Sequence, residues 1–272
     1  MILKATGLEM THFAASHPRE IRALIRNGQI GGPTAGLASG YAQANLVLLP
    51  AELADEFAIF CTRNPKPCPV LEVTDVGVPH PVRVATGADL RTDLPRYRIY
   101  REGRLAASVD QILVQWRDDL VAFLLGCSFT FEAALLAAGV PVRHLEERCN
   151  VPMYVTSVDC VPAGRFRGPL VGSMRPIPRH LVPRAVEVTG RYPAVHGAPI
   201  QIGDPGALGI GDLACPDFGD PVTVHPGEMP VFWACGVTPQ AVARRARPAL
   251  MITHEPGHMF VTDLRDADLA AP

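Results

Sequence analysis

The sequence predicts an α/β protein, and three features of the chain lead to this prediction. Across residues 222–261, short apolar runs typical of strands alternate with a helical pattern at 239–247, as they do in α/β sheets. Two runs at 97–101 and 104–107 flank a Glu-Gly dipeptide, which is a hairpin pattern. The 272 residues include 27 Pro and 24 Gly, so we expect short elements separated by many turns.

The predicted helices carry apolar residues three and four positions apart. The first begins at Ser16-His17-Pro18 and ends at Gly28, because capping residues and glycine mark helix ends. A longer pattern at 110–125 stops at a glycine, and a second helix follows it after a tight turn. The predicted helices are 16–28, 51–61, 110–125, 129–138, 181–191 and 239–247.

The predicted strands are short runs rich in β-branched and apolar residues. They are 70–73, 82–84, 97–101, 104–107, 153–161, 169–174, 222–224, 231–233, 250–253 and 259–261. The glycine-rich segments 31–45 and 193–221 are predicted to be ordered loops, and long loops of this kind in compact domains are usually functional. Residues 1–10 are interpreted as an extension before the ordered body.

The charge balance argues against nucleic acid as a partner. The chain has 25 Lys and Arg against 27 Asp and Glu, which gives a formal charge of -2 at pH 7, and no basic stripe could track phosphates. The apolar helix pattern at 120–125 is far too short to cross a bilayer, so no membrane contact is expected. We expect a small-molecule ligand and leave self-association into a homo-oligomer open.

The cysteine pattern predicts reduced thiols in a cytoplasmic protein. There are seven cysteines, an odd number, with no C-x-x-C spacing and no secretory signal pattern. A disulfide framework and a structural zinc site are therefore disfavoured. The glycine runs at 203–206 and 209–211 are not phosphate loops, and no dinucleotide fingerprint is present. We therefore expect no cofactor.

Two histidines near the end of the chain are the first candidates for catalysis. His254 and His258 follow the apolar run 249–252, and sites in α/β proteins lie just past the ends of buried strands. The intervening residues give the zinc-protease pattern His-Glu-x-x-His, but Pro256 and Gly257 break the helix that such a site needs. We expect a loop that carries both histidines toward a pocket. The alternative is that backbone hydrogen bonds satisfy both rings.

Cys127 and Ser128 are candidates for anion binding. They lie at the predicted N-terminus of the 129–138 helix, where a thiol pKa is lowered and N–H groups face an anion. An equally weighted alternative makes Cys127 a small buried hydrophobe and Ser128 an ordinary N-cap. Cys235 follows the apolar run 231–233 and is a candidate for the same site.

Arg175 ends a predicted strand, where its guanidinium fork suits a substrate carboxylate. His196, Asp204 and Asp212 lie in the long glycine-rich loop. They could supply a base or hold a divalent cation through oxygens. Asx turns and loop bracing explain these aspartates equally well.

Several motifs in order along the chain resemble those of a bacterial family of hydro-lyases that is similar to part of the mitochondrial D-glutamate cyclase. The resemblance covers nearly the whole chain, from about 33 to 263. Its carriers are GYAQAN at 40–45, RNPKPCP at 63–69, GCSFTFE at 126–132, SMRP at 173–176, HG at 196–197, GDP at 203–205, FWACGVTPQ at 232–240, and His254 with PGHM at 256–259.

The resemblance implies a fold and a reaction. It implies a three-layer αβα core with a mixed sheet at 1–63 and 110–272, and a smaller two-layer α+β part around 64–109 in one family unit, 1–272. It implies a carbon–oxygen lyase acting on a small amino or hydroxy acid, with cyclisation of D-glutamate to 5-oxo-D-proline as the specific expectation. The mitochondrial protein has a further cyclase-like region, and we expect this chain to be without it.

For that reaction the sequence suggests named roles. Arg175 would bind the α-carboxylate, His254 or His258 would be general base and acid, and N–H groups at Cys127 and Ser128 would hold the oxyanion. Five further polar side chains and one thiol are expected to contact the substrate. They are Gln43, Asn45, Asn64, His196, Asp204 and Cys235.

Three alternatives keep a pocket but change its use. The chain could be a binding module for an amino acid or 5-oxoproline that serves a partner enzyme. It could be a metal-dependent hydrolase that uses His196, Asp212, His254 and His258. A covalent route through Cys127 or Cys235 is the weakest of the three.

Overall fold

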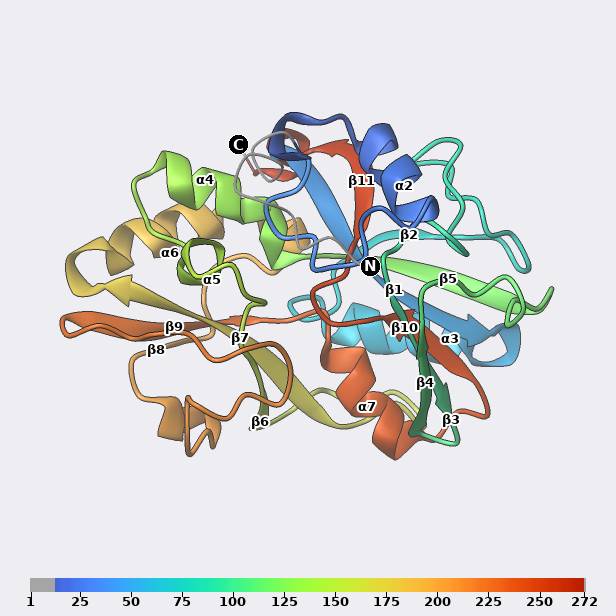
Figure 1. The fold of residues 1–272 in the computed structure, drawn as a ribbon. Helices are drawn as coiled ribbons and strands as arrows, with labels where there is room; N and C mark the ends of the chain where they lie inside the picture. The colour runs from blue at the N-terminus through green and yellow to red at the C-terminus, as the bar shows by residue number, and fades with distance from the viewer. Residues whose placement is uncertain (1–12, 272) are drawn as a thin grey trace.

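The computed structural model describes residues 13–271, so the expected N-terminal extension lies outside the described residues. Two β-sheets lie side by side with helices packed against them (Figure 1). This arrangement confirms the predicted α/β class. The larger sheet has seven strands and the smaller has four, and we call them the large sheet and the small sheet.

The large sheet is built around β1, which has β5 on one side and both β10 and β11 on the other. Its path is β2 (Val70–Val73), β5 (Leu120–Gly126), β1 (Tyr41–Pro50), β10 (Met251–His254), β3 (Tyr97–Arg101) and β4 (Arg104–Val109), with β11 (Phe260–Arg265) paired to β1. The small sheet follows β6 (Met153–Asp159), β7 (Pro169–Pro178), β9 (Glu228–Ala234) and β8 (Gln201–Ile202).

The helices cover these sheets and join them. The α-helices are α2 (Pro18–Arg26), α3 (Ala51–Arg63), α4 (Glu132–Ala137), α5 (Arg143–Glu146), α6 (Val182–Gly190) and α7 (Thr238–Ala246). The 3-10 helices are η1 (Ser128–Phe131), η2 (Arg179–Leu181), η3 (Pro193–Val195), η4 (Pro205–Leu208) and η5 (Asp266–Leu269). In Figure 1, α4, α5 and α6 lie together over the small sheet.

All strand pairings among the described residues are antiparallel, whereas a mixed sheet was expected. The family resemblance implied the mixed sheet, and the strand–helix alternation at 222–261 also favoured parallel crossovers. Here α7 follows β9 of the small sheet and precedes β10 of the large sheet. The alternation therefore connects two sheets rather than neighbouring strands of one.

The segment 64–109, expected as a separate smaller part, contributes β2, β3 and β4 to the large sheet. The smaller sheet comes instead from residues 153–234. How the chain divides into folding domains stays a prediction.

Several predicted segments have a different structure. Residues 82–84 and 222–224, predicted as strands, and residues 110–119, predicted as the start of a helix, form bends, turns or irregular backbone. Residues 120–125, predicted as the end of a helix, form the fully buried strand β5. Alternate residues of β5 pack into two different core clusters, so both of its faces are buried, the run is apolar throughout and the two-residue alternation of a strand is lost. Residues 41–45, predicted as a loop, form the start of β1. The polar residues of this segment, Gln43 and Asn45, are buried inside the sheet.

Other local predictions are confirmed. His17 caps α2, with its ring nitrogen accepting from the backbone of Arg19 and with Glu20 completing a capping box. The hairpin between β3 and β4 turns at Glu102 and Gly103, both at positive φ. In the hydrophobic core, successive β1 residues face opposite sides of the large sheet, Leu46 and Leu48 on one and Val47 and Leu49 on the other.

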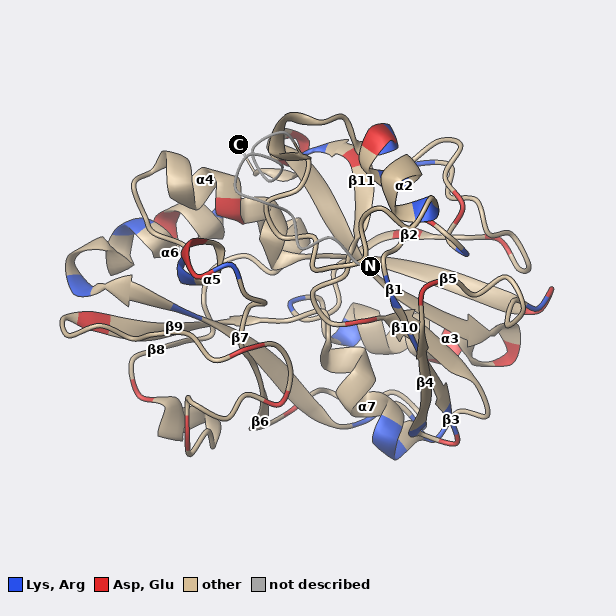
Figure 2. Cartoon of the chain, viewed as in Figure 1, with Lys and Arg blue, Asp and Glu red and all other residues tan. Residues whose placement is uncertain are grey.

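Charged residues of both signs are interspersed over the helices, the loops and the strand ends (Figure 2). Between residues 13 and 271, no helix combines the length and apolar character needed to span a bilayer.

Candidate active site

Residues that follow strands of both sheets meet where the sheets join. In the large sheet, β5 ends at Gly126 and leads into Cys127 and the 3-10 helix η1. In the small sheet, β7 carries Arg175, and β9 ends just before Cys235. Cys127 and Cys235 share one apolar cluster with Val171 of β7. The junction therefore brings together sequence segments that are far apart.

Arg175 is fully buried at this junction. Its Nε atom donates to Glu132 Oε1 at 3.1 Å, and its Nη2 atom donates to the same oxygen and to Ser128 Oγ at 3.0 Å. Its Nη1 atom donates to Ser173 Oγ at 3.3 Å. The rings of Phe131 and Trp233 each lie 5.4 Å from the guanidinium carbon. These contacts occupy the guanidinium N–H donors of Arg175 within the protein. Arg175 is therefore not free to bind a substrate carboxylate, contrary to the prediction from the sequence.

Glu132 is the acidic partner of Arg175 and is 3% exposed. Its Oε1 atom also lies 3.1 Å from His144 Nε2, without hydrogen-bond geometry. Burial alone would raise the pKa of Glu132, but the charges and contacts of His144 and Arg175 outweigh it and leave the pKa lowered. Within the described residues, Glu132 Oε2 has no hydrogen-bond partner. Glu132 is therefore an ionised buried carboxylate with one oxygen unused.

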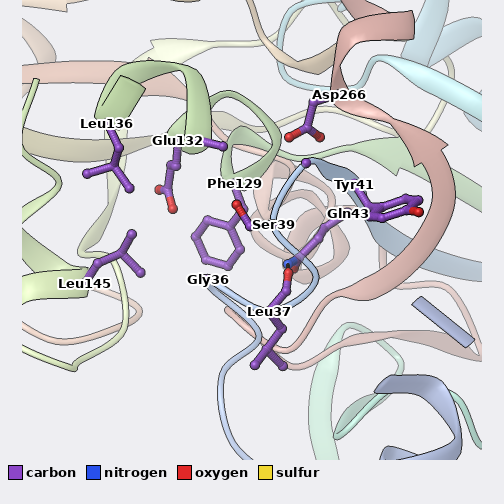
Figure 3. A pocket seen from close by; sticks show the side chains of 12 residues that line it. Gly36, Leu37, Ser39, Tyr41, Gln43, Phe129, Glu132, Leu136, Leu145 and Asp266 are labelled. Carbon is purple, nitrogen blue, oxygen red and sulfur yellow. Dashed lines mark hydrogen bonds between the residues drawn. The ribbon is translucent and has the colours of Figure 1, made fainter. Parts of the chain in front are cut away.

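Glu132 lines a small cavity of about 40 Å³ (Figure 3). Its polar lining comes from Glu132 itself, the amide of Gln43, Ser39, Tyr41 and the carboxyl group of Asp266, and no Lys or Arg is among the residues that line it. The remaining lining residues are glycine or apolar, and they are Gly36, Leu37, Gly40, Phe129, Ala133, Leu136 and Leu145. The cavity thus presents two carboxyl groups in a mainly apolar wall.

Asp266 differs sharply from Glu132 in its surroundings. It begins η5 and is 8% exposed, and its Oδ1 atom is buried without a hydrogen-bond partner among residues 13–271. Burial raises its pKa to about 7. The two carboxyl groups of one cavity therefore titrate in opposite directions, which is the pattern of an acid–base pair.

The thiols at the junction are poor nucleophiles. Cys127 precedes η1, and its sulfur accepts from the backbone of Phe129 at 3.5 Å. Burial raises its pKa and raises the pKa of Cys235 to about 11. The expectation that a helix N-terminus lowers the pKa of Cys127 is therefore wrong, because the loss of hydration outweighs the few N–H groups of a four-residue helix.

The three predicted histidines are held by the backbone. His254 Nδ1 accepts from the Leu46 N–H at 3.2 Å, and His196 Nδ1 lies 2.7 Å from the carbonyl oxygen of Lys66. Burial lowers the pKa of each to about 4, so both rings are neutral at pH 7. His258 Nδ1 lies 3.1 Å from the Pro256 carbonyl oxygen, and burial lowers its pKa too. None of the three lines the Glu132 cavity.

Among the predicted amides, two lie at the junction. Gln43 lines the cavity and is held by Thr34, whose hydroxyl donates to Gln43 Oε1 at 2.7 Å. Asn45 donates to the carbonyl oxygen of Gly126 at 2.7 Å and therefore connects β1 to the end of β5. Gly236 packs directly on this amide, since a Cβ atom there would overlap it.

Asn64 and Asp204 do not belong to the site as the structure has it. Asn64 bonds to the backbone of Phe60 and of Val161, so it fixes the end of α3. Asp204 is exposed, and its side chain caps η4 by accepting from Gly206 N–H at 2.8 Å. Backbone capping uses their polar atoms, as Asx turns commonly do.

The metal-hydrolase alternative requires the side chains of four residues to lie close together, and these are His196, Asp212, His254 and His258. Across residues 13–271, no group of three or more His, Cys, Asp or Glu side chains is arranged to hold a metal ion. The side chain of Asp212 instead accepts from Ala214 N–H in an exposed turn.

Three residues of the site were missed as functional groups. Glu132 is in the quoted 126–132 motif, four positions after Ser128, and that spacing is a usable signal for two groups on one face. His144 and Asp266 carry no such signal. They lie on elements that reach the junction only through tertiary packing.

Comparison with known proteins identifies the family. The D-glutamate cyclase family model matches residues 121–263. A protein of Thermoanaerobacter sp. strain X514 named "putative hydro-lyase" is 63% identical over 96% of this chain and 99% of its own length. One of Rubrobacter xylanophilus with the same name is 65% identical over 92% and 96%, and one of Bacillus subtilis strain 168 is 60% identical over 93% and 98%.

A solved structure of a nitrogen repressor-like protein from Methanococcus jannaschii overlaps this fold with a TM-score of 0.36 at 12% identity, over 80% of this chain and 86% of that one. An overlap this low supports no assignment.

An α/β fold with a buried cluster of polar and charged side chains, in a family of hydro-lyases, defines an enzyme of lyase type. The chain belongs to the D-glutamate cyclase family. The matched residues include Ser128, Glu132, His144 and Arg175, which together form the buried cluster.

Proposed function

We propose that this enzyme is a hydro-lyase that cyclises D-glutamate to 5-oxo-D-proline with release of water. The observation that carries the proposal is the match to the D-glutamate cyclase family over residues 121–263, a range that contains the buried Glu132–Arg175 pair. The ligand is accordingly a small carboxylic acid. The choice of D-glutamate as the substrate is our proposal.

The reaction sets clear chemical demands. The substrate ammonium must lose a proton before its nitrogen attacks the side-chain carboxyl carbon, forming the C–N bond of the lactam. The C–O bond then breaks, and the departing oxygen must be protonated to leave as water. One N–H hydrogen stays in the lactam and two leave with the oxygen. A base and an acid on one cavity can carry these protons.

We assign the base to Glu132 and the acid to Asp266. Glu132 is ionised and has an unused Oε2 atom, so it can accept a proton from the ammonium. The pKa of Asp266, raised by burial to about 7, keeps much of this carboxyl group protonated at neutral pH, so it can donate to the leaving oxygen. Arg175 holds Glu132 in place and ionised rather than touching the substrate.

The cavity must enlarge to admit the substrate. At about 40 Å³ it is far smaller than the roughly 300 Å³ or more typical of ligand pockets. The 36–41 segment lines it and contains Gly36 and Gly40, both at positive φ, where backbone rotation is least hindered. We propose that this segment moves when substrate enters.

Proton NMR of the purified protein with D-glutamate, L-glutamate and 5-oxo-D-proline tests the proposed reaction. We expect conversion of the D-isomer alone, and turnover should fall as the pH rises above about 7 because Asp266 ionises. Line-broadening of D-glutamate without conversion would instead identify a binding module. No broadening and no conversion would contradict the choice of substrate.

Two variants test the assigned roles. Glu132→Gln and Asp266→Asn are each expected to lower turnover by about 10²–10⁴-fold, with folding checked by circular dichroism. His254→Ala is the comparison, since its Nε2 atom is also buried without a partner among the described residues. Loss of turnover in His254→Ala with normal turnover in Asp266→Asn would transfer the acid–base role to His254.

A further inference from the structure

A second, larger cavity lies away from the candidate active site. It has a volume of about 330 Å³ and lies between the end of α2, the 92–96 segment and residues 110–111. This volume is within the range of small-ligand pockets. Every residue that lines it precedes residue 121, so it lies outside the matched family range. We call it the α2 cleft.

The α2 cleft has an apolar floor and a polar rim. Ile25, Ile30 and Pro95 line it and are buried. Around them stand polar side chains, and these are Arg26, Asn27, Thr92, Arg96, Asp110 and Gln111. A floor of this kind favours an aliphatic group, and the rim favours a polar head at one end of it.

The two arginines of the rim differ in whether their guanidinium groups are paired with a carboxylate. Arg26 is engaged by Asp93, with its Nε and Nη2 atoms 2.8 and 2.7 Å from the two carboxylate oxygens. The guanidinium of Arg96 makes no hydrogen bond or ion pair to any described residue, and its charge helps to lower the pKa of His258, which lies outside the cleft. Asp110 is exposed on the rim, where water screens its charge. Arg96 is therefore a half-buried cation with its fork free to bind a carboxylate.

Two adjacent glycines allow this cleft to be tested cleanly. Gly31 lines it, and a Cβ atom there would meet no other atom within 4 Å. Gly32 is equally open but is not among the lining residues. Neither has a positive φ, so both tolerate a side chain. We therefore expect a large side chain at Gly31 to occupy the cleft, and the same side chain at Gly32 to leave its lining unchanged.

We propose that the α2 cleft binds a small aliphatic monocarboxylate, with the carboxylate on Arg96 and the aliphatic chain on Ile25, Ile30 and Pro95. This site is separate from the Glu132 cavity, because the two share no lining residue. Binding here requires neither cyclase activity nor an intact acid–base pair. The inference therefore stands or falls independently of the proposed function.

The experiment is a ligand-observed NMR titration of the full-length protein with pentanoate, with pentanamide as a neutral ligand of the same length. We expect saturable binding of pentanoate and at least about tenfold weaker binding of pentanamide, since a charge-assisted hydrogen-bond pair is lost. Arg96→Gln should weaken pentanoate binding by a similar factor. Gly31→Leu should abolish it, and Gly32→Leu should bind as the wild type does.

Three outcomes would overturn the proposal. One is an absence of saturable pentanoate binding to the wild-type protein at millimolar concentration. Another is unchanged binding in both Arg96→Gln and Gly31→Leu, which would place the ligand elsewhere. The third is loss of binding in Glu132→Gln with retention in Arg96→Gln, which would move the ligand to the Glu132 cavity. Folding of each variant is checked by circular dichroism.

Discussion

At the scale of single residues, the site depends on how two carboxyl groups of one cavity differ. Glu132 is buried beside Arg175 and His144, and Asp266 is buried with no cation against it among residues 13–271. Neighbouring charges favour the ionised form of the first, whereas burial favours the neutral form of the second. Carboxyl groups would thus be both partners of the acid–base pair that we propose.

The raised pKa of Asp266 predicts a pH dependence of stability. An unfolded aspartate titrates near 3.8, whereas the folded one titrates near 7. Between these values the folded chain keeps a proton that the unfolded chain has released, so the free energy of unfolding falls as pH rises through this window. Asp266→Asn removes the effect. Its free energy of unfolding relative to wild type should rise by roughly 1–3 kcal/mol from pH 4 to pH 8.

Urea unfolding at pH 4, 6 and 8 measures this difference. The matched control is Asp268→Asn, because Asp268 is exposed in the same 3-10 helix. The same pH trend in the control would show that burial of Asp266 is not its cause.

The buried pair predicts a large effect on stability. Glu132→Gln leaves the fully buried Arg175 without its counter-charge, so the free energy of unfolding should fall by about 3–5 kcal/mol. Glu146→Gln is the control, since Glu146 pairs with Arg143 but is half exposed, and it should cost less than about 1 kcal/mol. Urea titrations compare the two. Equal small losses would mean that water reaches Arg175.

At the scale of elements, the sequence predicted most helices and strands but missed the centre of the large sheet. The pattern at 110–125 has helical spacing, yet β5 is buried on both faces and so shows no alternation. The polar residues Gln43 and Asn45 suggested a loop at the start of β1, because their buried hydrogen bonds to Thr34 and Gly126 are tertiary. A local sequence pattern shows neither the burial of both faces of β5 nor the tertiary hydrogen bonds of Gln43 and Asn45.

The sequence predicted which segments form the candidate site but not the roles of their residues. The motifs around Cys127, Arg175 and Cys235 indicated segments that do meet at the junction. The roles of these residues were not predictable, because burial and tertiary contacts determine the pKa of each side chain. Asp266 belongs to a segment with no motif, and η5 brings it to the cavity only because β11 pairs with β1.

Contact between β1 and the β9–α7 turn predicts a specific steric effect. Gly236→Ala should lower the free energy of unfolding by about 3 kcal/mol, since its Cβ atom would overlap the Asn45 amide. Combined with Asn45→Gly, the cost should be at least 1 kcal/mol below the sum of the single costs. Thermal and urea unfolding measure the cycle. Gly32→Ala is the open-space control, and additivity would contradict the contact.

At the scale of the whole molecule, the two sheets are joined by polar as well as apolar contacts. Arg175 of the small sheet bonds to Ser128 and Glu132, which follow β5 of the large sheet. Cys127, Val171 and Met259 share a core between them. Separating the sheets would expose this core and leave a buried charge unpaired, so neither sheet can unfold alone at small cost.

This joint predicts a single unfolding transition. The chain has two tryptophans, Trp116 packed on the core of the large sheet and Trp233 buried in β9 of the small sheet. In Trp116→Phe and in Trp233→Phe, fluorescence of the remaining tryptophan should give the same urea midpoint as far-ultraviolet circular dichroism. Midpoints that differ within one variant would show that the sheets unfold separately.

The position of β1 has a consequence for how the chain is made. Leu46 bonds to His254, 208 positions further on, so during synthesis this ten-residue strand leaves the ribosome long before β10 and β11 exist. Until then one edge of β1, whose residues 46–49 are all apolar, is open to any other nascent chain. We therefore expect chains truncated before residue 250 to aggregate, and the yield of soluble protein to depend on how quickly the last strands are translated.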